Sequence, residues 1–223
     1  MRRAVALAVD LDEIIDGIYD GFGTPAAGPL SPDTFGFDED LKPMEANLDE
    51  AKKLLKEAGL EDGFKTTIWT NDEQQRVDTA IYLQNQLKQL NIDVAIEQME
   101  WGAFLDKTAQ GEHDMYILGW SNPVGDADYG LYALFHSKNK GDPGNRSFYE
   151  NPEVDRLLDE GRQETDPEKR LAIYKEVQQI IAEDQPMVFI HHKDYLLGVS
   201  NAIEGFDINM AGKYQLRDVK FVE

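Results

Sequence analysis

Residues 64–99, FKTTIWTNDEQQRVDTAIYLQNQLKQLNIDVAIEQM, alternate between strand and helix signals. The first seven are rich in β-branched and aromatic side chains, which are typical of a strand. In the middle segment apolar residues recur three and four positions apart, and this spacing predicts an amphipathic helix. Ile92, Val94 and Ile96 then alternate with polar residues, as in a half-buried strand. The order strand, helix, strand favours an α/β domain.

The same alternation continues on both sides of this stretch. Before it, Asn47 and Glu50 have the spacing of a capping box, and Gly59 is placed to end the helix. After it we expect helices at 101–110, 151–164 and 166–184, and strands at 114–120, 186–192 and 193–200. The chain is therefore predicted to form a single α/β domain over residues 1–223, with a central mixed sheet flanked by helices.

Composition and charge exclude several classes of function. The formal charge is −21, from 43 acidic against 22 basic residues, which argues against nucleic acid as a partner. The absence of cysteine excludes disulfides, thiolate nucleophiles and zinc–thiolate sites. No apolar run approaches the roughly 20 residues that span a bilayer. Residues 1–20 are predicted to be a folded helix, because Asp10 and Asp12 interrupt the apolar run too early for a signal peptide.

The segment YILGWSNPVGDADYGLYALF, residues 116–135, places a polar, turn-prone loop directly after a buried strand. One interpretation is a nucleophile elbow with Ser121 as the nucleophile of a serine hydrolase. The proline at position 123, where that motif has its second glycine, opposes the tight turn that exposes the serine. A hydrolase would also need a histidine partner, for which His136, His191 and His192 are the candidates.

A second interpretation is a calcium loop that begins at Asp126 and stabilises a structural module. The match ends after two carboxylates, because the fifth and twelfth positions are Gly130 and Ser137. Asp126 and Asp128 are also well placed to cap the helix that follows them. We expect no metal and no cofactor.

The third interpretation is a wall that faces a ligand. In open α/β sheets, ligands bind at the carboxyl ends of strands. Trp120 and the loop after it occupy such an end, as do Trp69, Thr70 and Asn71. An indole offers an apolar face with one N–H donor, and neighbouring carboxylates and amides suit the polar groups of a peptide. Core packing is the competing explanation for both tryptophans.

Four segments, in this order, resemble the family 5 extracellular solute-binding proteins, the peptide, dipeptide, nickel and glutathione receptors of ABC importers. They are RRAVALAVDLDEIIDGIYDGFGTPAAGPLSP, NLDEAKKLLKEAGLEDGF, GWSNPVGDADYGLYALF and YENPEVDRLLDEGRQETDPEKRLAIYKEVQQIIAEDQPMVFIHH. The resemblance implies a type II periplasmic-binding-protein-like fold, whose two lobes close on a ligand. It also implies that this chain is the C-terminal lobe, and that an export signal or N-terminal anchor lies outside it.

The resemblance carries ligand contact onto Trp120, Ser121 and Asn122, and onto Thr70 and Asn71. In dipeptide and oligopeptide receptors an aspartate three residues after the matching tryptophan pairs with the peptide amine, but position 123 here is proline. An arginine near the end of the earlier strand holds the carboxylate in the dipeptide receptors, and TNDEQQ, residues 70–75, contains none. We therefore expect Asp126 or Asp128 to replace the missing carboxylate.

The pattern GWSxxxGxADxxLxxLF is most similar to the glutathione-type members of the family. The predicted function is capture of peptides or glutathione-like derivatives outside the membrane, without catalysis. The predicted partners are the ligand and the permease subunits of an ABC importer, and the predicted location is the periplasm or the cell surface.

Overall fold

The structure is a computed structural model that describes residues 1–142, 144–209 and 211–222. At its centre lies a three-stranded sheet with the order β3–β2–β4, formed by β2 (Phe64–Thr70), β3 (Ile92–Gln98) and β4 (Met115–Tyr116). All its strands are parallel, with Phe64 opposite Ile92 and Ile68 opposite Met115. The predicted α/β architecture is confirmed. The sheet places the carboxyl ends of its three strands along one edge.

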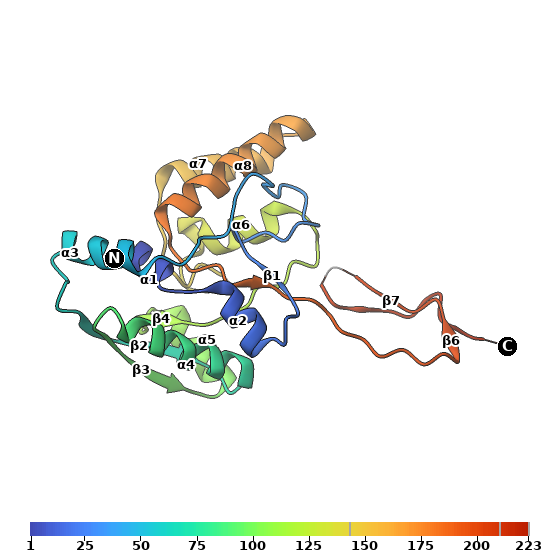
Figure 1. Ribbon diagram of the computed structural model, residues 1–223. Helices are drawn as coiled ribbons and strands as arrows, with labels where there is room; N and C mark the ends of the chain where they lie inside the picture. The colour runs from blue at the N-terminus through green and yellow to red at the C-terminus, as the bar shows by residue number, and fades with distance from the viewer. Residues whose placement is uncertain (143, 210, 223) are drawn as a thin grey trace.

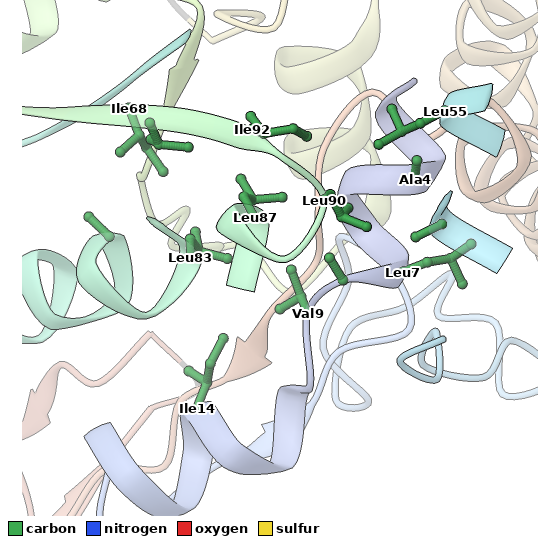
Figure 2. Close-up of a cluster of buried hydrophobic side chains, with 14 of the residues drawn as sticks. Ala4, Leu7, Val9, Ile14, Leu55, Ile68, Leu83, Leu87, Leu90 and Ile92 are labelled. Carbon is green, nitrogen blue, oxygen red and sulfur yellow. The ribbon is translucent and has the colours of Figure 1, made fainter. Parts of the chain in front are cut away.

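The helix α4 (Gln74–Lys88) joins β2 to β3, and α5 (Trp101–Gln110) joins β3 to β4 (Figure 1). One face of the sheet packs against α4 and the N-terminal helices α1 (Arg2–Leu7), α2 (Leu11–Ile18) and α3 (Leu48–Glu57). Figure 2 shows this core, where Ile68 and Ile92 from the sheet approach Leu83 and Leu87 from α4. Burial of such side chains stabilises the fold by roughly 1.5–3 kcal/mol each.

Residues 1–20 form two helices, so the prediction of one helix was wrong. The side chain of Asp10 accepts hydrogen bonds from the backbone amides of Asp12 and Glu13 and starts α2 there. A capping aspartate adopts extended backbone geometry, which interrupts a continuous helix. The predicted cap of α3 is confirmed, because the Asn47 side chain accepts from the amide of Glu50 at 3.0 Å.

A second core lies between three other helices, α6 (Ala127–Phe135), α7 (Pro152–Gln163) and α8 (Pro167–Asp184), with the short 3₁₀ helix η1 (Ser137–Asn139) between α6 and α7. Phe135, Leu158 and Tyr174 are fully buried at its centre. Figure 1 shows these helices grouped together, apart from the sheet. The loop between β4 and α6 therefore connects the two cores.

The antiparallel part of the predicted sheet is separate from the three parallel strands. The short strand β1 (Thr24–Pro25) pairs with β5 (His191–His192) in a two-stranded sheet. Only the last two residues of the strand predicted at 186–192 are paired, and the strand predicted at 193–200 was wrong, because these residues lie outside any strand.

After β5 the described chain leaves the body as an arm, residues 193–209 and 211–222 (Figure 1). Within the arm, β6 (Ile203–Glu204) pairs with β9 (Lys220–Phe221), and β7 (Asp207–Ile208) pairs with β8 (Tyr214–Gln215). Both pairs are antiparallel. Large apolar side chains are exposed along the arm, including Leu196, Leu216 and Phe221.

Candidate functional site

The strand ends that the sequence singles out lie together. Beyond β4, the amide of Ile117 donates to the carbonyl of Trp69 at 3.0 Å, and beyond β3 the amide of Met99 donates to the carbonyl of Thr70 at 3.1 Å. These bonds hold residues 69–71 between the chain segments that follow the two neighbouring strands. We call this line of strand ends the carboxyl edge. It is the place where open α/β sheets bind ligands.

Thr70 and Asn71 lie at the middle of the carboxyl edge, and both are buried. The side-chain oxygen Oδ1 of Asn71 accepts a hydrogen bond of 3.0 Å from Nη1 of Arg76. The hydroxyl of Thr70 is buried without a hydrogen-bond partner among the described residues. Asn71 thus holds a neighbouring arginine in place. Direct ligand contact by Thr70 or Asn71 stays a prediction.

Trp120 stands beyond the last paired residue of β4 and is 38% exposed. Its ring packs against Tyr129, on the first turn of α6, with the ring centroids 5.6 Å apart. Gly130 of α6 lies next to the indole, because a Cβ added at Gly130 would stand 3.9 Å from the indole nitrogen of Trp120. Core packing is therefore not the role of this tryptophan. It provides an exposed aromatic surface, and its contact with a ligand stays a prediction.

The two polar residues after Trp120 differ in their surroundings. Ser121 is exposed. The Asn122 side chain accepts from the amides of Val124 and Gly125, at 3.2 and 3.1 Å, and donates to the carbonyl of Asp126 at 2.9 Å. Asn122 therefore closes the loop on itself, as asparagine does in turns. Ser121 is the freer of the two to meet a ligand.

Asp126 is held on several sides. Nη1 and Nη2 of Arg170 donate to its two carboxylate oxygens at 2.6 and 2.8 Å, and the amide of Asp128 donates to Oδ1 at 2.9 Å. The predicted cap of α6 is confirmed at this residue. Burial works to raise the pKa of this carboxyl, but the hydrogen bonds from Arg170 and from the Asp128 amide lower it overall. Asp126 is thus ionised and already paired within the chain.

Asp128 has a different environment. Its Oδ1 lies 3.1 Å from Nε of Arg162, an ion pair whose N–H direction does not make a hydrogen bond. Burial raises the pKa of this carboxyl, against the opposing effect of Arg162. Both carboxylates proposed for a ligand amine therefore have arginine partners. Their pairing with a ligand stays a prediction. The Asp126 carboxylate would have to bind a ligand amine and Arg170 at the same time.

Arg170, on α8, was missed by the sequence analysis. Besides Asp126, its guanidinium donates to the carbonyl of Gly161 at 2.9 Å and to the hydroxyl of Tyr174 at 3.0 Å. Its only visible signal is its place in the amphipathic pattern of α8, four residues before Tyr174. The Phe35 backbone also pairs with the loop, because its amide donates to Gly125 and its carbonyl accepts from Ala127, both at 2.9 Å. The loop after Trp120 is therefore fixed before any ligand arrives.

Arg76, in the first turn of α4, was missed as well. It lies one residue beyond TNDEQQ, the segment after β2 that contains no arginine. Its Nε lies 3.1 Å from Glu73, and its guanidinium lies over the ring of Trp101, 5.5 Å from the centroid. A Cβ added at Gly119 would stand 3.6 Å from its Nη2. Arg76 thus spans the carboxyl edge from the start of α5 to the residue before Trp120.

The two alternative chemistries receive no supporting contact. No hydrogen bond joins Ser121 to a histidine in the described part of the chain. Residues 1–142, 144–209 and 211–222 contain no group of three or more histidine, aspartate or glutamate side chains arranged to hold a metal ion. A cavity of about 50 Å³ lies elsewhere, lined by Ala6, Leu11, Ala26 and neighbouring residues. It is much smaller than the roughly 300–1,000 Å³ of small-molecule sites.

The carboxyl edge and its aromatic loop agree with what comparison with known proteins finds. The model of the bacterial extracellular solute-binding proteins, family 5, matches residues 1–142. The chain belongs to this family. As its name states, the family comprises extracellular proteins that bind solutes. In the described residues, no helix has the length and apolar composition needed to cross a membrane.

Relatives of this family 5 chain include binding proteins for small peptides. The dipeptide-binding protein of Escherichia coli is 28% identical over 224 residues, which are 98% of this chain and 42% of that protein. The glutathione-binding protein GsiB of Salmonella choleraesuis is 30% identical over 213 residues, covering 92% of this chain and 41% of that protein. This family 5 chain therefore spans about two fifths of the length of these relatives.

Solved structures agree in fold. The dipeptide-binding protein of Pseudoalteromonas in complex with Met-Leu has a TM-score of 0.87 at 28% identity, over 99% of this chain and 45% of that one. The periplasmic binding protein DppA of Helicobacter pylori, in complex with the peptide STSA, has a TM-score of 0.82 at 36% identity. This match covers 86% of this family 5 chain and 38% of the DppA chain. The expected periplasmic-binding-protein-like fold is confirmed.

Proposed function

We propose that this chain is the C-terminal ligand-binding lobe of the substrate-binding component of an ABC importer. Its ligands are peptides or glutathione-like peptide derivatives, captured outside the membrane and passed to the permease subunits. The observation that carries the proposal is the carboxyl edge, where Trp120 stands exposed on a loop held by Arg170. The names of relatives, a dipeptide-binding and a glutathione-binding protein among them, support the ligand class.

The mechanism is reversible capture rather than catalysis. Trp120 and Tyr129 form an apolar wall, and Ser121 lies at its rim. A second lobe faces this wall, and a ligand that contacts both lobes favours the closed state because its interactions are stronger there. The closed form is the one that docks on the permease. A loop that is ordered in advance reduces the entropy lost on binding.

The test is a ligand panel on the intact two-lobed receptor, unfolded and refolded to remove carried ligand. Thermal unfolding is recorded with dipeptides, tripeptides, reduced and oxidised glutathione, and nickel. A ligand at 100 times its Kd stabilises the protein by about 2.7 kcal/mol, which raises the Tm measurably. We expect peptides or glutathione to raise the Tm. A panel in which none of them does so would contradict the proposal.

A further inference from the structure

Both residues of β5 are histidines, and they lie where the arm leaves the body. Their partners on β1 are Pro25, opposite His191, and Thr24, opposite His192. The amide of Ala26 also donates to the carbonyl of Ile190 at 3.2 Å. The arm begins at the next residue after β5 (Figure 1). The β1–β5 pair therefore fixes the base of the arm to the body.

The two histidines are closely packed. The His191 ring lies against the ring of Tyr19, at the end of α2, with the centroids 4.0 Å apart. On the β1 side, a Cβ added at Gly23 would stand 3.1 Å from Cδ2 of His191 and 3.0 Å from the carbonyl oxygen of His192. Nε2 of each histidine is buried and has no hydrogen-bond partner among the residues that the structure describes.

This packing suits neutral rings and opposes protonated ones. An imidazolium carries an N–H on both nitrogens, whereas a neutral imidazole carries only one. Protonation would therefore put a charged N–H at a buried Nε2 that has no acceptor, which is costly. The face of the Tyr19 ring attracts a cation and acts in the opposite direction.

Nearby charges do not compensate for this burial. The charged side chains that act on His191 or on its partner Tyr19 are those of Glu73, Arg76, Lys193 and Asp194. Lys193 and His192 disfavour a charged His191, and Asp194 favours it. Glu73 and Arg76, at the start of α4, have opposite charges and pair with each other at 3.1 Å. Burial is the largest effect, and it lowers the pKa of both histidines below the ordinary 6.5.

From this arrangement we infer that His191 and His192 form a pH-sensitive latch at the base of the arm. Neutral rings hold the β1–β5 pair together, and protonated rings loosen it. Because the folded state disfavours the protonated form, the stability of the pair is complete above about pH 6.5 and is lost as the pH falls below it. The inference goes beyond the proposed function, since it concerns how the arm is held and not what the receptor binds.

The test measures amide hydrogen exchange on the intact, ligand-free receptor at about pH 7.5 and about pH 5. Protection factors, which correct for the intrinsic effect of pH on exchange, are compared for peptides that cover residues 24–26 and 187–192. We expect protection to fall in acid by roughly 10- to 100-fold, the range for a buried group left without its hydrogen bond. In the double variant His191→Phe/His192→Gln, protection should be equal at both pH values, because neither position titrates.

His113→Phe is the matched control. His113 is also buried with a lowered pKa, but it packs against Trp69 and Phe148. This variant should lose protection in acid as the parent does. If the double variant does not fold, each single variant, His191→Phe or His192→Gln, should remove part of the loss. Equal protection of the parent at both pH values, or a parent-like loss in the variants without these histidines, would overturn the latch. Neither result bears on the ligand, so the proposed function is tested separately.

Discussion

At the scale of single residues, the account depends on how the carboxylates after Trp120 are used. The sequence predicts the cap that Asp126 makes, but α6 already begins at Ala127, so Asp128 lies in its first turn rather than before it. It does not reveal Arg170, because this partner lies 44 residues away along the chain and its spacing is only that of an amphipathic helix. Long-range charge pairing of this kind leaves no local pattern to detect. Arg76 is different, because its partners Asn71 and Glu73 are close in sequence and it lies one residue beyond TNDEQQ.

Asp126→Asn should destabilise the fold by about 1.5–3 kcal/mol, because it removes the charge from two hydrogen bonds and leaves Arg170 without its carboxylate partner. The free energy of unfolding from urea titration measures this. Asp128→Asn is the matched control two residues further along the chain, where burial raises the pKa of the carboxyl. It should be neutral or stabilising at pH 7. Equal destabilisation by the two variants would contradict the clamp by Arg170.

The pH dependence of stability should follow from the same pair. The pKa of the Asp126 carboxyl is lower in the folded state than its ordinary value of 3.8. Such a group stabilises the fold above its unfolded pKa, and this contribution is lost as the pH falls through the folded pKa. Below about pH 4, the parent should therefore lose stability more steeply than Asp126→Asn. Urea titrations at a series of pH values between 7 and 3 would show parallel curves if the clamp were unimportant.

At the scale of elements, the local sequence signals of residues 64–99 were sufficient to predict their two strands and the helix between them. Both strands and the helix between them appear where the hydrophobic periods place them. The strand predicted at 114–120 was too long, since β4 has only two residues. The cause is its neighbour, because β2 ends at Thr70 and leaves the residues beyond Ile117 without a partner. Because β4 is short, Trp120 lies outside the sheet. The sequence of residues 114–120 does not by itself indicate where the strand ends.

Two glycines before β2 offer a matched test of the close backbone packing at the start of the β2–β3 pair. Gly59 and Gly63 both have a positive φ, +70° and +77°. A Cβ at Gly59 meets nothing within 4 Å, whereas at Gly63 it would stand 1.8 Å from the carbonyl oxygen of Asn91. Gly59→Ala should cost about 1 kcal/mol through backbone strain, and Gly63→Ala about 3 kcal/mol or more. Thermal unfolding of the two variants measures the difference, and equal losses would contradict the close packing at Gly63.

At the scale of the whole molecule, this chain spans about two fifths of the length of the relatives named above, and it carries one wall of the proposed site. The sequence predicted the class of fold but not the arm that follows β5, whose short strands lack the length that makes a strand recognisable. Its exposed apolar residues do not follow a simple alternation. Tertiary surroundings, rather than local preference, decide the conformation of such segments.

Because the ligand is proposed to bridge two lobes, this chain alone should bind peptides weakly or undetectably. Closure contributes affinity only when both walls contact the ligand. Calorimetry of the 223-residue chain with trialanine and with glutathione measures this, and the intact receptor serves as the control. A micromolar Kd for the isolated chain would show that its single wall is sufficient.

The central claim is that the ligand lies on the carboxyl edge against Trp120. It is tested most directly by a crystal structure of the intact receptor with the tightest-binding probe of the panel. We expect a peptide or glutathione in contact with the Trp120 ring. A ligand bound away from this ring would contradict the proposed function.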